Sequence, residues 1–145
     1  MHGFLLQLAD RFRPLQGEHR QRGRAGERAA ERHLRKRGYR TLARNLRSRH
    51  GELDLLMQDP AGTLVVVEVK TRRRDPAAAS THRPEARVGP AKQRQITALA
   101  TRLARHHRLT QRPWRFDVVG VDLPAPGQTD PPTIRHHVAA FDAGF

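Results

Sequence analysis

The chain has 145 residues, no cysteine and a formal net charge of +14, from 28 basic and 14 acidic side chains. This length suits a single domain, and the absence of cysteine excludes disulfide scaffolds, zinc ribbons and cysteine nucleophiles. No apolar run approaches the roughly 18–20 residues that span a bilayer, and the apolar stretch at residues 4–9 is too short for a secretory signal. We therefore expect a cytoplasmic protein without a membrane partner.

The excess of basic residues favours a polyanionic partner, because bound arginine and lysine side chains release counterions from a phosphate backbone. Only three of the basic residues are lysines, however, and alanine and proline are also frequent. A GC-rich genome produces the same bias. The charge alone therefore leaves nucleic-acid binding and genome composition as alternative explanations.

The first half of the chain predicts an arm, a helix and three strands. Residues 1–22 are basic and contain helix-interrupting proline and glycine, so we expect a flexible N-terminal arm. Residues 24–37 have the apolar spacing of a short amphipathic helix, which the following glycine should end. Strands are predicted at residues 39–45, 52–57 and 63–70, and the last of these is β-branched and nearly continuous, as a buried central strand would be.

The second half predicts a long loop, a helix and two further strands. The polar residues 71–89 form the loop, and Pro90 suits the first turn of a helix at residues 91–107. Strands are predicted at residues 116–123 and 134–141. A helix between the third and fourth strands implies a parallel crossover. We therefore predict a single α/β (α+β) domain at residues 23–145, with a mixed β-sheet flanked by helices in the order α-β-β-β-α-β(-β).

The hairpin formed by the second and third strands brings two carboxylates together. If Asp54 lies opposite Glu68, the same register pairs Asp59 with Thr63 and leaves a three-residue turn, or a five-residue loop one pair earlier. Side chains alternate along a strand, so Lys70 then shares the face of Glu68. The turn therefore predicts two carboxylates and a lysine on one surface.

Two carboxylates this close repel each other and need a cation between them or a proton on one of them. One Asp, one Glu and a backbone carbonyl suit Mg²⁺, with Mn²⁺ as an alternative, because such ions keep several waters and bind substrate phosphate. Lys70 could then orient the attacking water or neutralise developing charge. An ordinary surface salt bridge is the alternative interpretation, but Glu68 interrupts a valine-rich strand, where an unpaired carboxylate destabilises the fold.

The spacing of Asp54, thirteen intervening residues and Glu68-Val69-Lys70 resembles the D-x(n)-E-x-K signature of the PD-(D/E)XK restriction-endonuclease-like superfamily. More closely, the chain resembles the uncharacterised YraN-type bacterial family, which is similar to archaeal Holliday-junction resolvases. Leu53 stands where the superfamily name has proline. The matching segments cover about residues 24–142 and are Gly26-Glu27, Ala30, Gly38-Tyr39, Asn45, residues 51–55, residues 67–72, Lys92 and residues 115–119.

This resemblance implies a restriction-endonuclease-like fold and a Mg²⁺-dependent endonuclease acting on DNA, including structured or branched DNA. It implies metal binding by Asp54 and Glu68, assistance by Lys70 and an approach of Glu27 to the metal site. It also implies a possible homodimer, because resolvase-like relatives act as dimers on two-fold substrates. The dipole at a helix N-terminus explains Glu27 equally well.

Further charged residues around the predicted site are candidates for accessory and binding roles. Glu52 precedes Asp54 by two residues and is either an outer-shell group or a solvated charge. Arg72, Arg73 and Arg74 could hold a nucleic-acid backbone or only solubilise the loop. Lys92 extends the inward stripe of the second helix, where a cation opposes the dipole, so we assign it a phosphate contact.

The histidine pairs at residues 106–107 and 136–137 do not suit zinc, because adjacent side chains point different ways. We interpret them as surface or edge residues. Three hypotheses follow: a Mg²⁺-dependent nuclease, a non-catalytic nucleic-acid-binding module with the same fold, and an interaction protein whose arginines follow genome composition.

Overall fold

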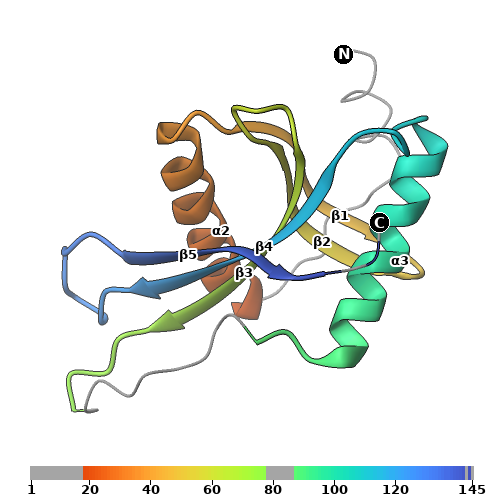
Figure 1. Cartoon of the computed structure of the whole chain (residues 1–145). Helices are drawn as coiled ribbons and strands as arrows, with labels where there is room; N and C mark the ends of the chain where they lie inside the picture. Colours follow the sequence, from red (N-terminus) through yellow and green to blue (C-terminus); the bar gives the residue numbers. More distant parts are fainter. Residues whose placement is uncertain (1–17, 78–86, 143, 145) are drawn as a thin grey trace.

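The computed structural model describes residues 18–77, 87–142 and 144, so residues 1–17 of the expected arm and residues 78–86 of the expected loop lie outside the described residues. The described residues form two helices and five strands in the predicted order (Figure 1). These elements are α2 (Glu18–Lys36), β1 (Arg40–Ser48), β2 (Gly51–Gln58), β3 (Leu64–Arg73), α3 (Pro90–His106), β4 (Trp114–Leu123) and β5 (Thr133–Phe141).

Helix α2 begins six residues before the predicted start at residue 24, and it ends just before Gly38, as predicted. Its start at Glu18 extends it into the expected arm, because residues 18–22 (EHRQR) contain no helix breaker. At its other end Gly38 has a φ of +87° and donates its N–H to the carbonyl of Arg35, while Tyr39 donates to the carbonyl of Leu34. These are the two bonds of a Schellman motif, with glycine at the left-handed position.

The strands form one five-stranded sheet in the order β1-β2-β3-β4-β5. Strands β3 and β4 run parallel, as the intervening helix α3 predicts, and the other neighbouring pairs are antiparallel. The mixed sheet flanked by helices is therefore confirmed. No helix in the described part of the chain is long and apolar enough to cross a membrane.

The turn between β2 and β3 has the predicted register. Leu55 pairs with Val67, and the Asp59 N–H donates to the carbonyl of Thr63 at 3.0 Å. The Asp59 carboxylate also accepts hydrogen bonds from the N–H groups of Ala61 and Thr63 at 3.0 and 2.9 Å, which fixes the turn from inside. The three-residue turn is therefore the one that the chain adopts.

Two apolar cores lie on opposite faces of the sheet, since neighbouring residues of β3 belong to different cores. The core on the α3 face includes Leu64 and Val66 with Ile96 of α3, and the core on the α2 face includes Val65 and Val67. The α3 core also holds the aromatic residues of the last two strands: Phe116 is buried there, and Trp114 and Phe141 pack against it.

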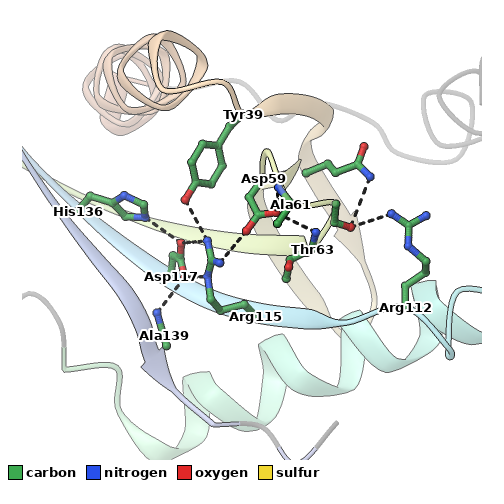
Figure 2. A network of polar contacts seen from close by, with 11 residues as sticks. Tyr39, Asp59, Ala61, Thr63, Arg112, Arg115, Asp117, His136 and Ala139 are labelled. Atoms are coloured by element: carbon green, nitrogen blue, oxygen red, sulfur yellow. Dashed lines mark hydrogen bonds and ion pairs between the residues drawn. The ribbon is translucent and has the colours of Figure 1, made fainter.

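A largely buried network of hydrogen bonds and ion pairs connects β4 with neighbouring segments on the α2 face of the sheet (Figure 2). Asp117 is 1% exposed and accepts hydrogen bonds from the Arg115 guanidinium at 2.8 and 3.0 Å. Arg115 also donates to Asp59 at 2.8 Å and to the Tyr39 hydroxyl at 3.0 Å. His136 Nε2 lies 2.8 Å from Asp117 Oδ2, so this histidine is in the edge strand β5, as expected, but its ring is buried rather than at the surface.

Candidate functional site

Asp54 lies where strands β2 and β3 separate. The bond between Asp59 and Thr63 sets hydrogen-bonded pairs at every second position, so the ladder would next join the Val69 N–H to the carbonyl of Leu53. The paired residues end at Leu55 and Val67, however, and the Val69 N–H donates to Asp54 Oδ2 at 2.8 Å. The Asp54 carboxylate therefore replaces a ladder bond at the point of divergence.

The side-chain alternation of β2 also breaks at this residue. Leu53 belongs to the core on the α3 face, whereas Leu55 belongs to the core on the α2 face. Residues two apart in a regular strand share a face, so the strand is twisted at Asp54. The prediction of regular alternation through residues 52–56 is therefore wrong, because Asp54 directs its carboxylate towards β3.

Glu68 is the next residue of the site and lies on the α3 face, 7% exposed. Its Oε1 is 3.6 Å from Lys92 Nζ and 4.0 Å from Lys70 Nζ. Burial and the charge of Asp54 together raise the pKa of Glu68 to about 7, against the opposing effect of the two lysines. Burial also raises the pKa of Asp54, against the hydrogen bond from Val69. The two carboxyls thus act on each other, as the predicted register requires.

Glu27 reaches the site from helix α2. Burial raises its pKa to about 7, followed by the charge of Asp54, while a hydrogen bond from Asn45 opposes the rise. The helix can approach because Gly26 has no side chain: a Cβ there would lie 1.8 Å from Thr71 Oγ1 and 2.8 Å from Thr71 Cβ. The structure therefore brings Glu27, Asp54 and Glu68 together, with Asp54 in the middle.

Asn45 is a residue of this site to which the sequence motifs assign no role. The register of β1 and β2 places it opposite Asp54, between the pairs Arg44–Leu55 and Leu46–Leu53. Its φ is +48°, a left-handed conformation that asparagine tolerates better than most residues. A strained residue beside a polar site is typical of functional positions. The sequence signal was limited to its place in the family pattern.

The other predicted residues lie nearby but are engaged within the chain. Glu52 forms an ion pair with Arg47 of β1 at 2.7 Å, although its charge also raises the pKa values of Asp54 and Glu27. It lies at the border of the site and remains a candidate for an accessory role.

The three arginines after the site contact strands β4 and β5 or the segment between them. Arg72 forms an ion pair with Asp122 at 2.5 Å, and Arg73 donates to the carbonyl of Pro124 at 3.3 Å. Arg74 donates to the carbonyl of Pro131 and to the Thr133 hydroxyl. Nucleic-acid binding by these arginines remains a prediction, and these contacts would have to open or be shared.

The acidic residues suit a hard cation that keeps most of its ligands as water. Asp54 and Glu68 offer carboxylate oxygens, and burial raises the pKa of both in spite of the opposing charge of Lys92, so a further cation would be favoured between them. Within residues 18–77, 87–142 and 144, no group of three His, Cys, Asp or Glu side chains is arranged to hold a metal ion. Asp54 and Glu68 would therefore hold such an ion with two carboxylates and leave its other positions to water, without a closed cage.

Comparison with known proteins identifies the family. Residues 26–121 match the uncharacterised protein family UPF0102. A UPF0102 protein of Trichlorobacter lovleyi is 40% identical over 123 residues, which cover 85% of this chain and 91% of the relative. One of Anaeromyxobacter dehalogenans is 42% identical over 83% of each chain, and one of Symbiobacterium thermophilum is 46% identical over 69% and 80%. The chain therefore belongs to the bacterial UPF0102 family, the YraN-type family that its motifs resemble.

Proposed function

We propose that this protein is a metal-dependent nuclease that hydrolyses phosphodiester bonds of DNA. The observation that carries the proposal is the Asp54–Glu68 pair, held at the divergence of β2 and β3 with Lys70 on the face of Glu68. A carboxylate buried in the valine-rich strand β3 destabilises the fold unless a cation or a proton neutralises it. The sequence pattern of the site resembles the PD-(D/E)XK superfamily, which supplies the reaction class.

Each side chain then has a defined task. Asp54 and Glu68 would hold Mg²⁺ or Mn²⁺, and the bound ion supplies positive charge that polarises a phosphodiester and acidifies water. Lys70, whose side chain is 42% exposed, can donate a hydrogen bond to the attacking water or to the oxygen on which charge develops. Glu27, with a pKa of about 7, can take up or return a proton near neutral pH.

The proposal is tested with duplex, single-stranded and four-way-junction DNA in Mg²⁺ or Mn²⁺. We expect cleavage of at least one substrate and loss of that cleavage in Asp54→Asn and Lys70→Ala. Asp142→Asn is the matched control, because Asp142 is an exposed carboxylate that follows the last strand, β5. Cleavage that persists in both site variants would refute the assigned mechanism.

A non-catalytic nucleic-acid-binding module is the second candidate, and one observation favours it. The Lys92 ammonium lies 3.6 Å from Glu68 and already provides this carboxylate with positive charge. If Lys92 replaces the metal ion, the chain should bind DNA in a salt-dependent manner without cleaving it. Isothermal titration with Mn²⁺ separates the two candidates, since only the nuclease requires an ion whose binding Asp54→Asn abolishes.

The resemblance to junction resolvases supports two finer proposals. The DNA would be branched, and two copies of the chain would act on its two-fold symmetric arms. A junction substrate should then be preferred over duplex of the same sequence, and sedimentation in its presence should give two chains per junction. One chain per junction would contradict the dimer.

A further inference from the structure

A hollow of about 380 Å³ lies between helix α2 and the beginning of strand β5, outside the acidic site. Its size falls within the range of about 300–1,000 Å³ that is usual for small-ligand sites. Helix α2 contributes Arg32, His33 and Lys36, and the opposite wall consists of Pro131, Pro132 and Ile134. The hollow thus has a basic wall facing an apolar one.

The basic wall lacks a counter-charge within the hollow. Among the residues that the structure describes, no carboxylate lines the hollow. Asp130, the residue before Pro131, forms an ion pair with the Arg74 guanidinium at 3.9 Å instead. His33 Nε2 is buried without a hydrogen-bond partner among the described residues. Burial lowers the pKa of His33, and the nearby side chains of Arg37, His136 and Lys36 lower it further. A buried polar atom in positive surroundings suits a bound anion.

The hollow and the acidic site lie on opposite flanks of α2. At about 100° per residue, Lys36 is about 180° and Arg32 about 140° away from Glu27 around the helix axis. Three further arginines, Arg24, Arg35 and Arg28, fall at about 60°, 80° and 100° on the same arc. All four arginines and Lys36 are exposed. Glu31, at about 40°, is buried and paired with Arg44. From about 60° to the hollow, an arc of positive charge therefore crosses the outer surface of α2.

We propose that the hollow binds a phosphate group of a nucleic-acid strand that crosses helix α2 from the acidic site. The role of the acidic site in this inference rests on the proposed function, whereas phosphate binding in the hollow does not. Arg32 and Lys36 supply the charge that a phosphate needs, and His33 supplies a hydrogen-bonding nitrogen. The two prolines and Ile134 offer an apolar wall for the attached sugar or base.

A strand is favoured over a free nucleotide because of the exposed arc. Consecutive arginines at i and i+4, such as Arg24, Arg28 and Arg32, are about 6 Å apart along the axis. A separate phosphate-binding pocket would need no such row of charges leading away from it. An extended polyanion uses both features, since each phosphate that it places against a cation adds counterion release.

The test uses the full chain in metal-free buffer, with inorganic phosphate, thymidine monophosphate and a short single-stranded oligonucleotide as probes. NMR should show that all three probes shift the ring signals of His33. Oligonucleotide affinity is then measured over a salt series for Arg32→Glu/Lys36→Glu. The slope of log affinity against log salt should become shallower by about 0.7 for each phosphate that the variant no longer neutralises. Arg102→Glu/Arg105→Glu, two exposed arginines of α3, is the charge-matched control and should keep the slope.

Two results would overturn the inference. Unchanged His33 signals with every probe would remove the phosphate site. His33 shifts with phosphate and thymidine monophosphate, combined with equal salt slopes in the two double variants, would assign the hollow to a free nucleotide instead of a strand. The same experiments in an Asp54→Asn background separate this inference from the nuclease proposal. Binding in the hollow should persist there whether or not the wild-type chain cleaves DNA.

Discussion

A single methyl group at Gly26 should displace helix α2 and with it the acidic site. In Gly26→Ala the new Cβ would lie 1.8, 2.7 and 2.8 Å from Oγ1, Cγ2 and Cβ of Thr71. Rotating the threonine side chain can move the first two atoms but not its Cβ. Carbon atoms in contact are normally about 3.5–4.0 Å apart, so the backbones of α2 and β3 must separate by about 1 Å.

Gly23 provides the matched control for this change. Gly23 lies one turn earlier in α2. A Cβ added there would have the Glu27 carboxylate as its nearest neighbour, at 4.0 Å, which is an ordinary contact. In both variants the change from Gly to Ala raises the free energy of unfolding by about 1 kcal/mol, because alanine has the higher helix propensity. In Gly26→Ala, overpacking against Thr71 lowers it by about 1–3 kcal/mol. Gly23→Ala should therefore be stabilised by about 1 kcal/mol, and the difference between the two variants, about 1–3 kcal/mol, measures the clash at Thr71.

Urea unfolding followed by the fluorescence of Trp114, the single tryptophan, gives both free energies. Gly26→Ala/Thr71→Ala, which removes two of the three close atoms, should recover part of the loss. In Gly26→Ala the pKa of Glu27 should also fall, since the shift of α2 moves its carboxyl away from Asp54. Equal stabilisation of the two glycine variants would refute the close approach of α2 to β3.

Four further predictions concern the carboxylates and their neighbours. In metal-free buffer, Asp54→Asn should lower the pKa values of Glu68 and Glu27 from about 7, because the charge of Asp54 raises both; carboxyl NMR titration measures this, and unchanged values would contradict the central place of Asp54. Because these two folded-state pKa values lie above the ordinary 4.5, their contribution to stability is present below pH 4.5 and lost as the pH rises through 7, so unfolding free energies should decline less over this range in Asp54→Asn. Asn45→Ala should raise the pKa of Glu27, because it removes the hydrogen bond from Asn45. Asn45→Gly should raise the pKa of Glu27 equally but be more stable than Asn45→Ala, since glycine accepts the positive φ. Asp117→Asn should cost about 3–5 kcal/mol, the usual loss when a buried charge pair is broken, and urea unfolding at pH 7 against Asp142→Asn as an exposed control would show it.

The sequence predicted the acidic pair because the turn sets the register. Asp59, Pro60 and Gly62 mark one short turn, and its register, continued one position beyond the paired Leu55 and Val67, brings residue 54 next to residue 68. The parallel crossover was equally predictable, since a helix separates the third and fourth strands. Both features depend on local signals and on a rule of chain connectivity.

The contacts of the three arginines could not be predicted in this way. Arg72 meets Asp122 because the parallel register places these two residues opposite each other. The turn of a hairpin fixes its register, but a crossover that includes a helix and long connections does not. Arg135 of β5 joins the same carboxylate at 3.0 Å. The sequence therefore indicated a basic segment but not the carboxylate that holds it.

The twist at Asp54 was missed because it results from competing interactions that alternation rules ignore. A regular strand would bond Val69 through the backbone and would leave the Asp54 side chain on one face of the sheet. Replacing that ladder bond with the Asp54 carboxylate satisfies the Val69 N–H and opens the sheet between its two faces. Glu27 approaches from the α2 side and Glu68 lies on the α3 side, and each interacts with Asp54. The departure from regular β-structure is thus the feature that brings carboxyls from both layers into a single site.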